Sequence, residues 1–266
     1  MIGFLAASLA LAPSANMVRL RYNLHTGQNL QYAVSSTMLM RMPEKGVLKD
    51  LAVDTNYLVK ETVSLVDRQG VAVIDSELTD QQFVLNGKSY KVKPGVRPVS
   101  TVRRVSSGGR VESETVTNGS GAKVSEINPS TMTLQAVFPD GLVRVGSTWT
   151  SEVMSESKTG GTFKYTLEAL TVENGHRVAV FSSDGTVDLK TVLAGIMRQH
   201  PSGMTGTADC KGRYRFDLDR GLFVGTSMNV TLKFQIPTTD PLTKTTIQTP
   251  GAGRLQAVTE LVDQAS

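Results

Sequence analysis

Apolar and polar residues alternate through the middle of the chain, between Leu142 and Phe181. The alternation begins at Trp149, is interrupted at Thr159-Gly160-Gly161, resumes at Phe163 and is interrupted again at Asn174-Gly175. Side chains on a strand point alternately to its two faces, so a period of two indicates β-structure. Asn-Gly supplies the positive backbone angles of a tight hairpin. This stretch therefore predicts a β-meander.

The same alternation recurs on both sides of the meander, separated by turns rich in Gly, Pro, Asn and Asp. It predicts strands at Val18–Tyr22, Asn29–Met42, Leu51–Val66, Val71–Ile74, Val99–Val105, Val111–Val116, Thr205–Phe216, Leu222–Ile236 and Arg254–Val262, and a small hairpin around Asn86-Gly87. The segment around Met132, Leu134 and Val137 fits neither period, and we leave it between a short helix and an extended connection.

One segment has helical spacing instead. Its apolar residues recur at i, i+3, i+4, i+7 and i+8, with Asp188 as a possible N-cap and Pro201 after its end: Leu189, Val192, Leu193, Ile196 and Met197. This pattern predicts an amphipathic helix.

Two parts of the chain have similar patterns. Lys60–Ile74 and Leu167–Phe181 both contain a Glu-initiated strand, a Gly turn and a Val-Ala-Val strand, and each follows a shorter strand, a Gly turn and an aromatic residue. We therefore predict a mainly β protein, with a large curved antiparallel sheet or half-barrel made of two related halves, about 17–125 and 126–266. The helix would pack on the concave face. Coincidence between two ordinary hairpins is the alternative.

The composition agrees with long strands that have one wet face, because 39% of the 266 residues are hydrophobic and 6% aromatic. The net charge of +4 is scattered, apart from Arg103, Arg104 and Arg110. These arginines have no aromatic neighbours or nucleic-acid motif beside them, so we interpret them as a solvated hairpin face and expect no nucleic-acid partner.

The N-terminus resembles a secretory signal. Residues Ile2–Leu11 are nearly all apolar, and small residues follow at Ala12–Ala15. No Lys or Arg precedes the run, and the run is shorter than the roughly 20 residues of a bilayer span. We expect residues 1–16 to be a signal peptide, residues 17–266 to form one domain, and the protein to be exported, periplasmic or extracellular, without a transmembrane span.

The residues that carry chemistry are few. The three histidines, His25, His176 and His200, lack partners at metal spacing, and we find neither a nucleophile elbow nor a phosphate loop. Asp217-Leu218-Asp219 lacks the further oxygen ligands of a calcium loop and predicts a polar β-turn. Cys210, the single cysteine, occupies an ordinary strand position. We therefore predict no enzyme activity, no cofactor and no metal, although residues distant in sequence could still form a hydrolase site.

Two short motifs resemble a group of bacterial exported β-rich domains of unknown function. They are Val143-Arg144-Val145-Gly146-Ser147-Thr148-Trp149, preceded by Phe138-Pro139, and the opening from Leu20 to Tyr32. The resemblance implies an exported β domain and no catalytic residues. At the level of fold alone, long antiparallel strands with one amphipathic helix resemble the half-barrels of periplasmic lipoprotein carriers, in which a sheet holds acyl chains.

These observations favour a non-enzymatic exported protein that binds an apolar or lipid-like ligand or an envelope partner. The side chains expected to line its cavity are Trp149, Phe163, Tyr165, Leu193, Ile196 and Met197. The three aromatic residues among them have an alternative role as simple core. A structural or assembly module that pairs through β edges is the alternative function. Neither the ligand nor the oligomeric state follows from the sequence.

Overall fold

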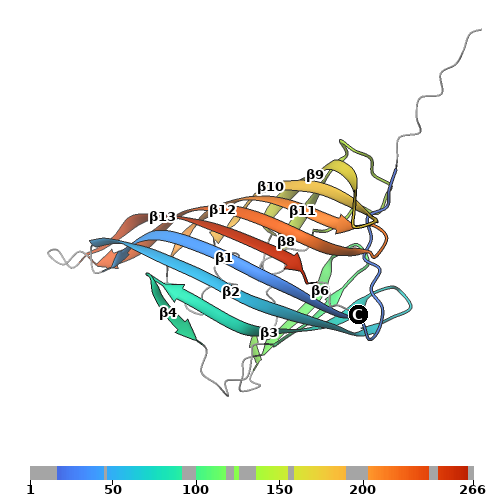
Figure 1. Cartoon of the computed structure of the whole chain (residues 1–266). Coiled ribbons are helices and arrows are strands. Elements are labelled where there is room, and N and C mark those ends of the chain that lie inside the picture. Colours follow the sequence, from blue (N-terminus) through green and yellow to red (C-terminus); the bar gives the residue numbers. More distant parts are fainter. Residues whose placement is uncertain are drawn as a thin grey trace, which may run out of the picture.

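The computed structural model describes residues 17–44, 47–91, 100–117, 123–125, 136–154, 159–189, 203–239 and 245–262. The thirteen elements within these ranges are all strands (Figure 1). They are β1 (Asn29–Glu44), β2 (Val47–Val66), β3 (Ala72–Leu85), β4 (Lys88–Lys91), β5 (Ser100–Val105), β6 (Val111–Thr117), β7 (Lys123–Ser125), β8 (Thr148–Met154), β9 (Thr159–Glu173), β10 (His176–Asp188), β11 (Thr205–Asp217), β12 (Leu222–Thr239) and β13 (Thr246–Leu261).

All these strands belong to one open antiparallel sheet, in the order β7-β6-β5-β3-β2-β1-β13-β12-β11-β10-β9-β8, with β4 added beside β3. The first and last strands are neighbours, and β1 pairs with β13 over ten residue pairs, from Tyr32–Leu261 to Arg41–Ala252. The mainly β prediction is confirmed. Because one sheet includes both parts of the chain, the structure does not separate two halves as units.

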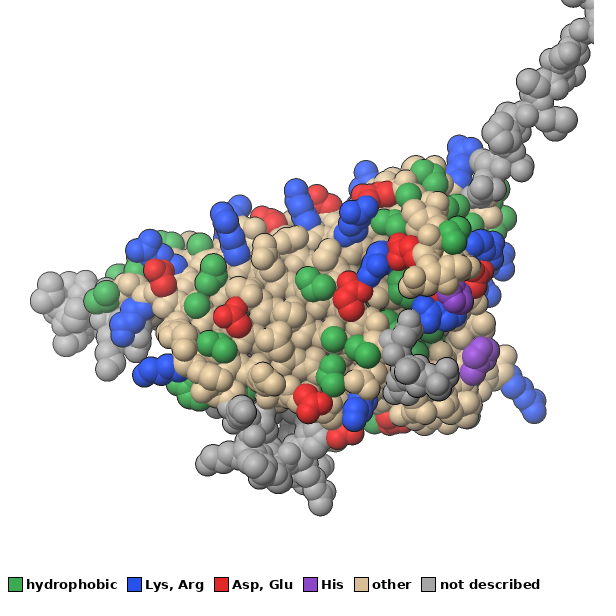
Figure 2. Space-filling view, in the orientation of Figure 1, with side chains coloured by type: hydrophobic (Ala, Val, Ile, Leu, Met, Phe, Trp, Pro, Cys, Tyr) green, Lys and Arg blue, Asp and Glu red, His purple; other side chains and the backbone are tan. Residues whose placement is uncertain are grey.

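The sheet has one apolar face, as the alternation predicts. We call it the inner face, and the cross-strand pairing aligns its side chains in rows. One row crosses six strands through Phe181, Tyr214, Thr226, Thr259, Val34 and Tyr57. The opposite, outer face is solvated: in Figure 2 single hydrophobic side chains lie among charges of both signs. The long alternating strands therefore turn every second residue towards the apolar face.

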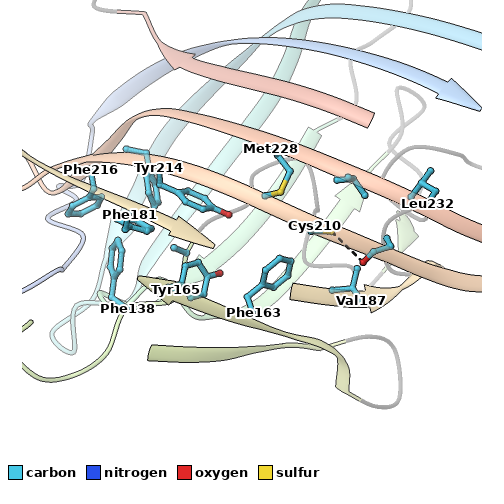
Figure 3. Packing of buried hydrophobic residues seen from close by; sticks show 14 of the residues in the cluster. Phe138, Phe163, Tyr165, Phe181, Val187, Cys210, Tyr214, Phe216, Met228 and Leu232 are labelled. Carbon is cyan, nitrogen blue, oxygen red and sulfur yellow. Dashed lines mark hydrogen bonds between the residues drawn. The ribbon is translucent and has the colours of Figure 1, made fainter. Parts of the chain in front are cut away.

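The aromatic core lies on the inner face of β9 to β12. The Phe181 and Tyr214 rings stack with centroids 5.0 Å apart, and neither residue is more than 1% exposed. Phe138 packs edge-on against Phe216 at 4.7 Å. Figure 3 shows these four rings close together, with Tyr165 and Phe163 further along the same face. This region contains the largest buried side chains of the described chain.

Two segments outside the strands, residues 17–28 and 136–147, cross one end of the sheet, and Figure 1 shows the first in blue. They pair with each other through two 2.8 Å hydrogen bonds between Val18 and Val143. Tyr22 N–H donates to Ser107 O at 2.9 Å in the β5–β6 turn, and Gly146 N–H donates to Leu167 O at 2.8 Å in β9. The two segments therefore connect strands near both edges of the sheet.

The same local geometry occurs at the ends of these two segments. Gly27 N–H donates to Val63 O, and Gly146 N–H donates to Leu167 O, while each acceptor residue donates its own N–H to the residue after the glycine. Both acceptors lie beside a β-bulge, between Val63 and Leu65 in β2 and beside Leu167 in β9. The two acceptors also have equivalent cross-strand partners. Val63 of β2 lies opposite Ile74 of β3, and Leu167 of β9 lies opposite Phe181 of β10.

Two predicted elements differ from the structure. Val18–Tyr22 forms only an isolated bridge, because its later backbone bonds go to turns and not to a strand. The Thr159–Gly161 break lies within β9, where a side chain on Gly161 would approach Val187 Cγ1 to 2.6 Å. The predicted amphipathic helix stays a prediction: Asp188, its possible N-cap, is the last residue of β10, Leu189 is helical, and residues 190–197 lie outside the described residues.

Candidate functional site

Charged side chains are buried on the inner face of the strands that precede the aromatic core. Glu61 of β2, Arg103 of β5 and Glu114 of β6 are 4%, 2% and 2% exposed, and Ser76 of β3 lies opposite Glu61. Arg103 lies opposite Glu114 in the β5–β6 pair. Removing a charge from water is costly unless a partner compensates it. These positions therefore need internal partners.

Hydrogen bonds connect three of these side chains. Arg103 Nη2 donates to Glu61 Oε1 and, at 3.2 Å, to Ser76 Oγ. Ser76 Oγ in turn donates to Glu61 Oε1 at 3.2 Å. We call Glu61, Ser76, Arg103 and Glu114 the buried ionic cluster. It forms a polar region on an otherwise apolar face.

The prediction of a solvated arginine face is wrong for Arg103. Alternation along β5 points Arg103 inward with Thr101 and Val105 and points Arg104 outward. Arg104 is 45% exposed and lies 3.6 Å from Asp67. The sequence signal for such a residue is a charged side chain at a position where the alternation expects a buried one, as at Glu61 between Val59 and Val63.

A cavity of about 50 Å³ adjoins the buried ionic cluster. It lies between the end segment that carries Tyr22 and the inner face of the sheet. Its lining is mainly apolar and aromatic, with Glu61 as the charged residue: Tyr22, Leu24, Leu30, Tyr32, Glu61, Ile74, Leu222, Phe223, Thr226 and Thr259. Sites for drug-sized ligands have about 300 Å³ or more. This cavity can therefore hold a small chemical group and not a whole acyl chain.

Tyr22 brings an unused hydroxyl to this cavity. The residue is 9% exposed, and its Oη has no hydrogen-bond partner among the described residues. Burial raises the pKa of Tyr22 well above its ordinary value, and burial and then Glu61 raise the pKa of Tyr32. Both phenols are therefore neutral across the physiological range, and either can donate a hydrogen bond.

The predicted aromatic site residues lie together in the core of β8 and β9. Trp149 stacks on Tyr165 with centroids 5.4 Å apart, and its Nε1 donates to Val137 O at 2.8 Å. Phe163 and Tyr165 are 3% and 4% exposed. None of these three lines the cavity described above. Leu193, Ile196 and Met197 lie outside the described residues, so a ligand site that includes them stays a prediction.

The Asp217–Asp219 turn is held by hydrogen bonds within the protein. His176, Asp217 and Asp219 have ligand atoms within 4.8 Å of one another. However, Asp217 accepts bonds from the Asp219 and Arg220 N–H groups and from Arg220 Nε at 2.6 Å. Asp219 accepts three bonds from Arg177. Both carboxylates thus already have strong donors, as expected of a polar turn.

Cys210 is an unreactive core residue. It is 4% exposed, and burial, with smaller contributions from Asp209 and Asp184, raises the pKa of its thiol to about 12. The thiolate, which is the nucleophilic form, is therefore scarce at neutral pH.

Within the described residues, no helix has the length and hydropathy needed to cross a membrane.

No family model matches the sequence, and no curated protein matches it either. The resemblance to bacterial exported domains thus finds no support there. Among solved structures, one that concerns lipid–protein interactions in lipovitellin aligns over 92% of this chain with a TM-score of 0.53 and 10% sequence identity. The alignment covers 26% of the lipovitellin chain, so this protein spans about a quarter of its length. This likeness shows the β fold alone.

A second solved structure, DynF from the dynemicin biosynthesis pathway of Micromonospora chersina, aligns over 97% of this chain and 92% of its own. Its sequence identity is 9% and its TM-score is 0.22, which is too low to carry an argument.

Proposed function

We propose that this protein is a non-enzymatic binder of an apolar or lipid-like ligand, which lies along the inner face of the sheet. The observation that carries the proposal is an incompletely covered apolar surface. Three inner-face residues, Val53 of β2 and Leu255 and Ala257 of β13, are only half-buried, whereas the inner-face residues of β10 to β12 are largely buried. Apolar surface left open on a sheet is a typical feature of a ligand or partner site.

Two further points support this function. The fold is similar to part of lipovitellin, whose structure is described in terms of lipid–protein interactions. The small cavity beside Glu61 would take only one end of an amphiphile, while the chain would follow the half-buried residues. In this proposal the sheet acts as a half-barrel. Export and the absence of catalysis are parts of the same proposal, which rest on the apolar N-terminal run and on the lack of catalytic motifs.

We also propose that the two halves of the chain, about 17–125 and 126–266, are related. Two features support this relationship. Gly27 and Gly146 donate equivalent hydrogen bonds to Val63 and Leu167, and a β-bulge lies beside each of these acceptors. Two such halves would together form one inner face that is long enough for the hydrocarbon chain of a ligand.

The experiment is a titration of the full chain with a fluorescent fatty-acid probe, in wild type and in two variants of β13. Ala257→Phe adds bulk to the inner face, and Val258→Phe makes the matched change on the outer face, where Val258 is 43% exposed. We expect Ala257→Phe to weaken probe binding about tenfold and Val258→Phe to leave it unchanged. Equal behaviour of the two variants, or no binding by wild type, would contradict the proposal.

The sheet edges favour a second candidate, a module that assembles by strand pairing. β8 is an edge strand of seven residues, and within the described residues its free side pairs with no other strand. Unpaired edges offer backbone groups to another chain. Light scattering across a range of concentrations tests this function, and a strict monomer throughout would exclude it.

A further inference from the structure

The cavity beside the buried ionic cluster has a specific chemical character. The hydrogen bonds from Arg103 and Ser76 both end on Oε1 of Glu61, so Oε2 accepts none among the described residues. Glu61 is 4% exposed and lines the cavity. A carboxylate oxygen at this position can accept a hydrogen bond only from a group that enters the cavity.

The open oxygen belongs to a charged group, which favours a cationic donor. Glu61 is 4% exposed, and its carboxylate accepts the hydrogen bonds of Arg103 and Ser76 through Oε1 alone. A hydrogen bond from an ionised donor to a carboxylate is shorter and stronger than one from a neutral donor, so a positively charged ligand group suits this position.

The other walls suit the same kind of group. Tyr22, Tyr32 and Phe223 contribute aromatic rings to the lining, and the Tyr22 and Phe223 centroids are 5.7 Å apart. Aromatic rings attract cations. The Tyr22 hydroxyl, buried and without a partner, lies in the same lining and can accept a bond from an ammonium N–H.

We propose that this cavity binds the protonated primary amine of an amphiphile, with ammonium N–H groups donating to Glu61 Oε2 and to Tyr22 Oη. A volume of about 50 Å³ accommodates a small headgroup. A primary ammonium group can donate to both oxygens, whereas a trimethylammonium group has no N–H to donate. The chain of the ligand leaves the cavity past Thr226 and Thr259, which are half-buried on the inner face. This inference rests on the proposed function and names the headgroup that it selects.

The test compares four ligands with the same ten-carbon chain, each displacing a fluorescent probe from the full chain below its critical micelle concentration. They are decylamine, decanol, decanoate and decyltrimethylammonium. We expect wild type to prefer the amine over the alcohol by about tenfold or more, because a hydrogen bond from a charged group is stronger than one from a neutral hydroxyl. The acid and the quaternary amine should bind more weakly than the primary amine.

Two variants assign the preference to the cavity. Glu61→Gln should remove the preference for the amine. Tyr22→Phe removes only a hydroxyl without a partner, so the variant should fold, and it should reduce the preference at least threefold. Tyr214→Phe is the matched control, because its hydroxyl bonds to Ser183 outside the cavity. It should leave the preference unchanged.

The outcomes separate the two proposals. If the amine and the alcohol bind equally well, or if the preference persists in Tyr22→Phe, the headgroup inference is wrong and the apolar-ligand function stands. A preference for the acid or for the quaternary amine overturns the inference in the same way. If none of the four ligands displaces the probe, the proposed function itself fails.

Discussion

Ser76 of β3 and Ser183 of β10 occupy matching positions in the sheet, but their neighbours differ. Each is two residues beyond a buried apolar residue that faces a bulged strand. Ser76 hydrogen-bonds to Glu61 and accepts a bond from Arg103. Ser183 lies opposite Tyr165, and its Oγ is 3.3 Å from the Tyr214 hydroxyl. The same arrangement of strands thus contains ions in one region and phenols in the other.

The difference shows how one backbone pattern can be used in two ways. In β8 to β12 the phenols belong to a continuous aromatic core in which Tyr214 stacks on Phe181. In β2 to β6 the charges lie beside a cavity, and Glu61 belongs to both. Buried ion pairs contribute little net stability compared with apolar side chains of similar size. The region of β2 to β6 is therefore suited to binding, and the region of β8 to β12 is suited to packing.

The largest expected effect is that of removing the one positive charge from the buried ionic cluster. Arg103→Met removes the charged partner of the buried Glu61 carboxylate and should lower the free energy of unfolding by about 3–5 kcal/mol. The matched change in the aromatic region, Tyr214→Phe, removes one neutral hydrogen bond and should cost about 1 kcal/mol. Urea unfolding of both variants measures the difference. Equal costs would mean that Arg103 is not buried among these charges.

A double-mutant cycle should give the next largest effect. Glu61→Gln alone leaves Arg103 with a weaker acceptor, whereas Glu61→Gln combined with Arg103→Met removes the pair. We expect the double variant to be more stable than the sum of the two single effects predicts, by about 2 kcal/mol, because directly bonded residues couple. The corresponding cycle of Ser183→Ala and Tyr214→Phe should give a coupling below about 1 kcal/mol. Additive effects in the first cycle would contradict the bond between Glu61 and Arg103.

The two regions also differ in how far the sequence predicted them. Alternation predicted the strands of both, and the meander around Asn174-Gly175 became β8 to β10. Strand order could not be predicted, because the pairing of β1 with β13 depends on contacts between the two ends of the chain. The sequence leaves Trp149, Phe163 and Tyr165 as either core or cavity residues, and in the structure they lie in the aromatic core.

The candidate site was less predictable, for a physical reason. Glu61, Ser76 and Arg103 come from three strands and meet only through register, while Tyr22 reaches them from a segment that is not a strand. Composition and motifs do not contain that information. The position of each charge within the alternation does contain it, because Glu61 and Arg103 both occupy positions of their strands where the alternation expects buried residues.

The glycine turns should show where the two regions are alike. Gly27 and Gly146 have φ values of +85° and +86°, and a Cβ on either would meet no atom within 4 Å. Alanine at either position therefore introduces backbone strain alone, and each substitution should cost about 1–2 kcal/mol. Thermal unfolding of Gly27→Ala and Gly146→Ala checks this expectation. A cost at one glycine and none at the other would weaken the proposed relationship between the halves.

The smallest effect should come from two aspartates in hairpin turns, Asp67 after β2 and Asp219 after β11. Backbone N–H groups lower the pKa of both carboxyl groups below the ordinary value of 3.8, mainly that of Val71 for Asp67 and that of Arg177 for Asp219. A carboxyl group whose pKa is lower in the folded state stabilises the protein above its unfolded pKa. It loses this contribution as the pH falls through the folded value.

Asp67→Asn and Asp219→Asn should therefore each flatten the loss of thermal stability below about pH 4 and leave the slope between pH 5 and pH 7 unchanged. Salt distinguishes the two sites. Asp219 also accepts a 2.7 Å charged hydrogen bond from Arg177. The hydrogen bonds to the Asp67 carboxylate come from the Gln69 and Val71 N–H groups, and its charged neighbour Arg104 is further away, at 3.6 Å. Because salt screens exposed charge pairs more than it affects backbone hydrogen bonds, 0.5 M salt should reduce the effect of Asp219→Asn more than that of Asp67→Asn. Equal sensitivity to salt would mean that the charge of Arg177 adds nothing to the backbone bonds of its turn.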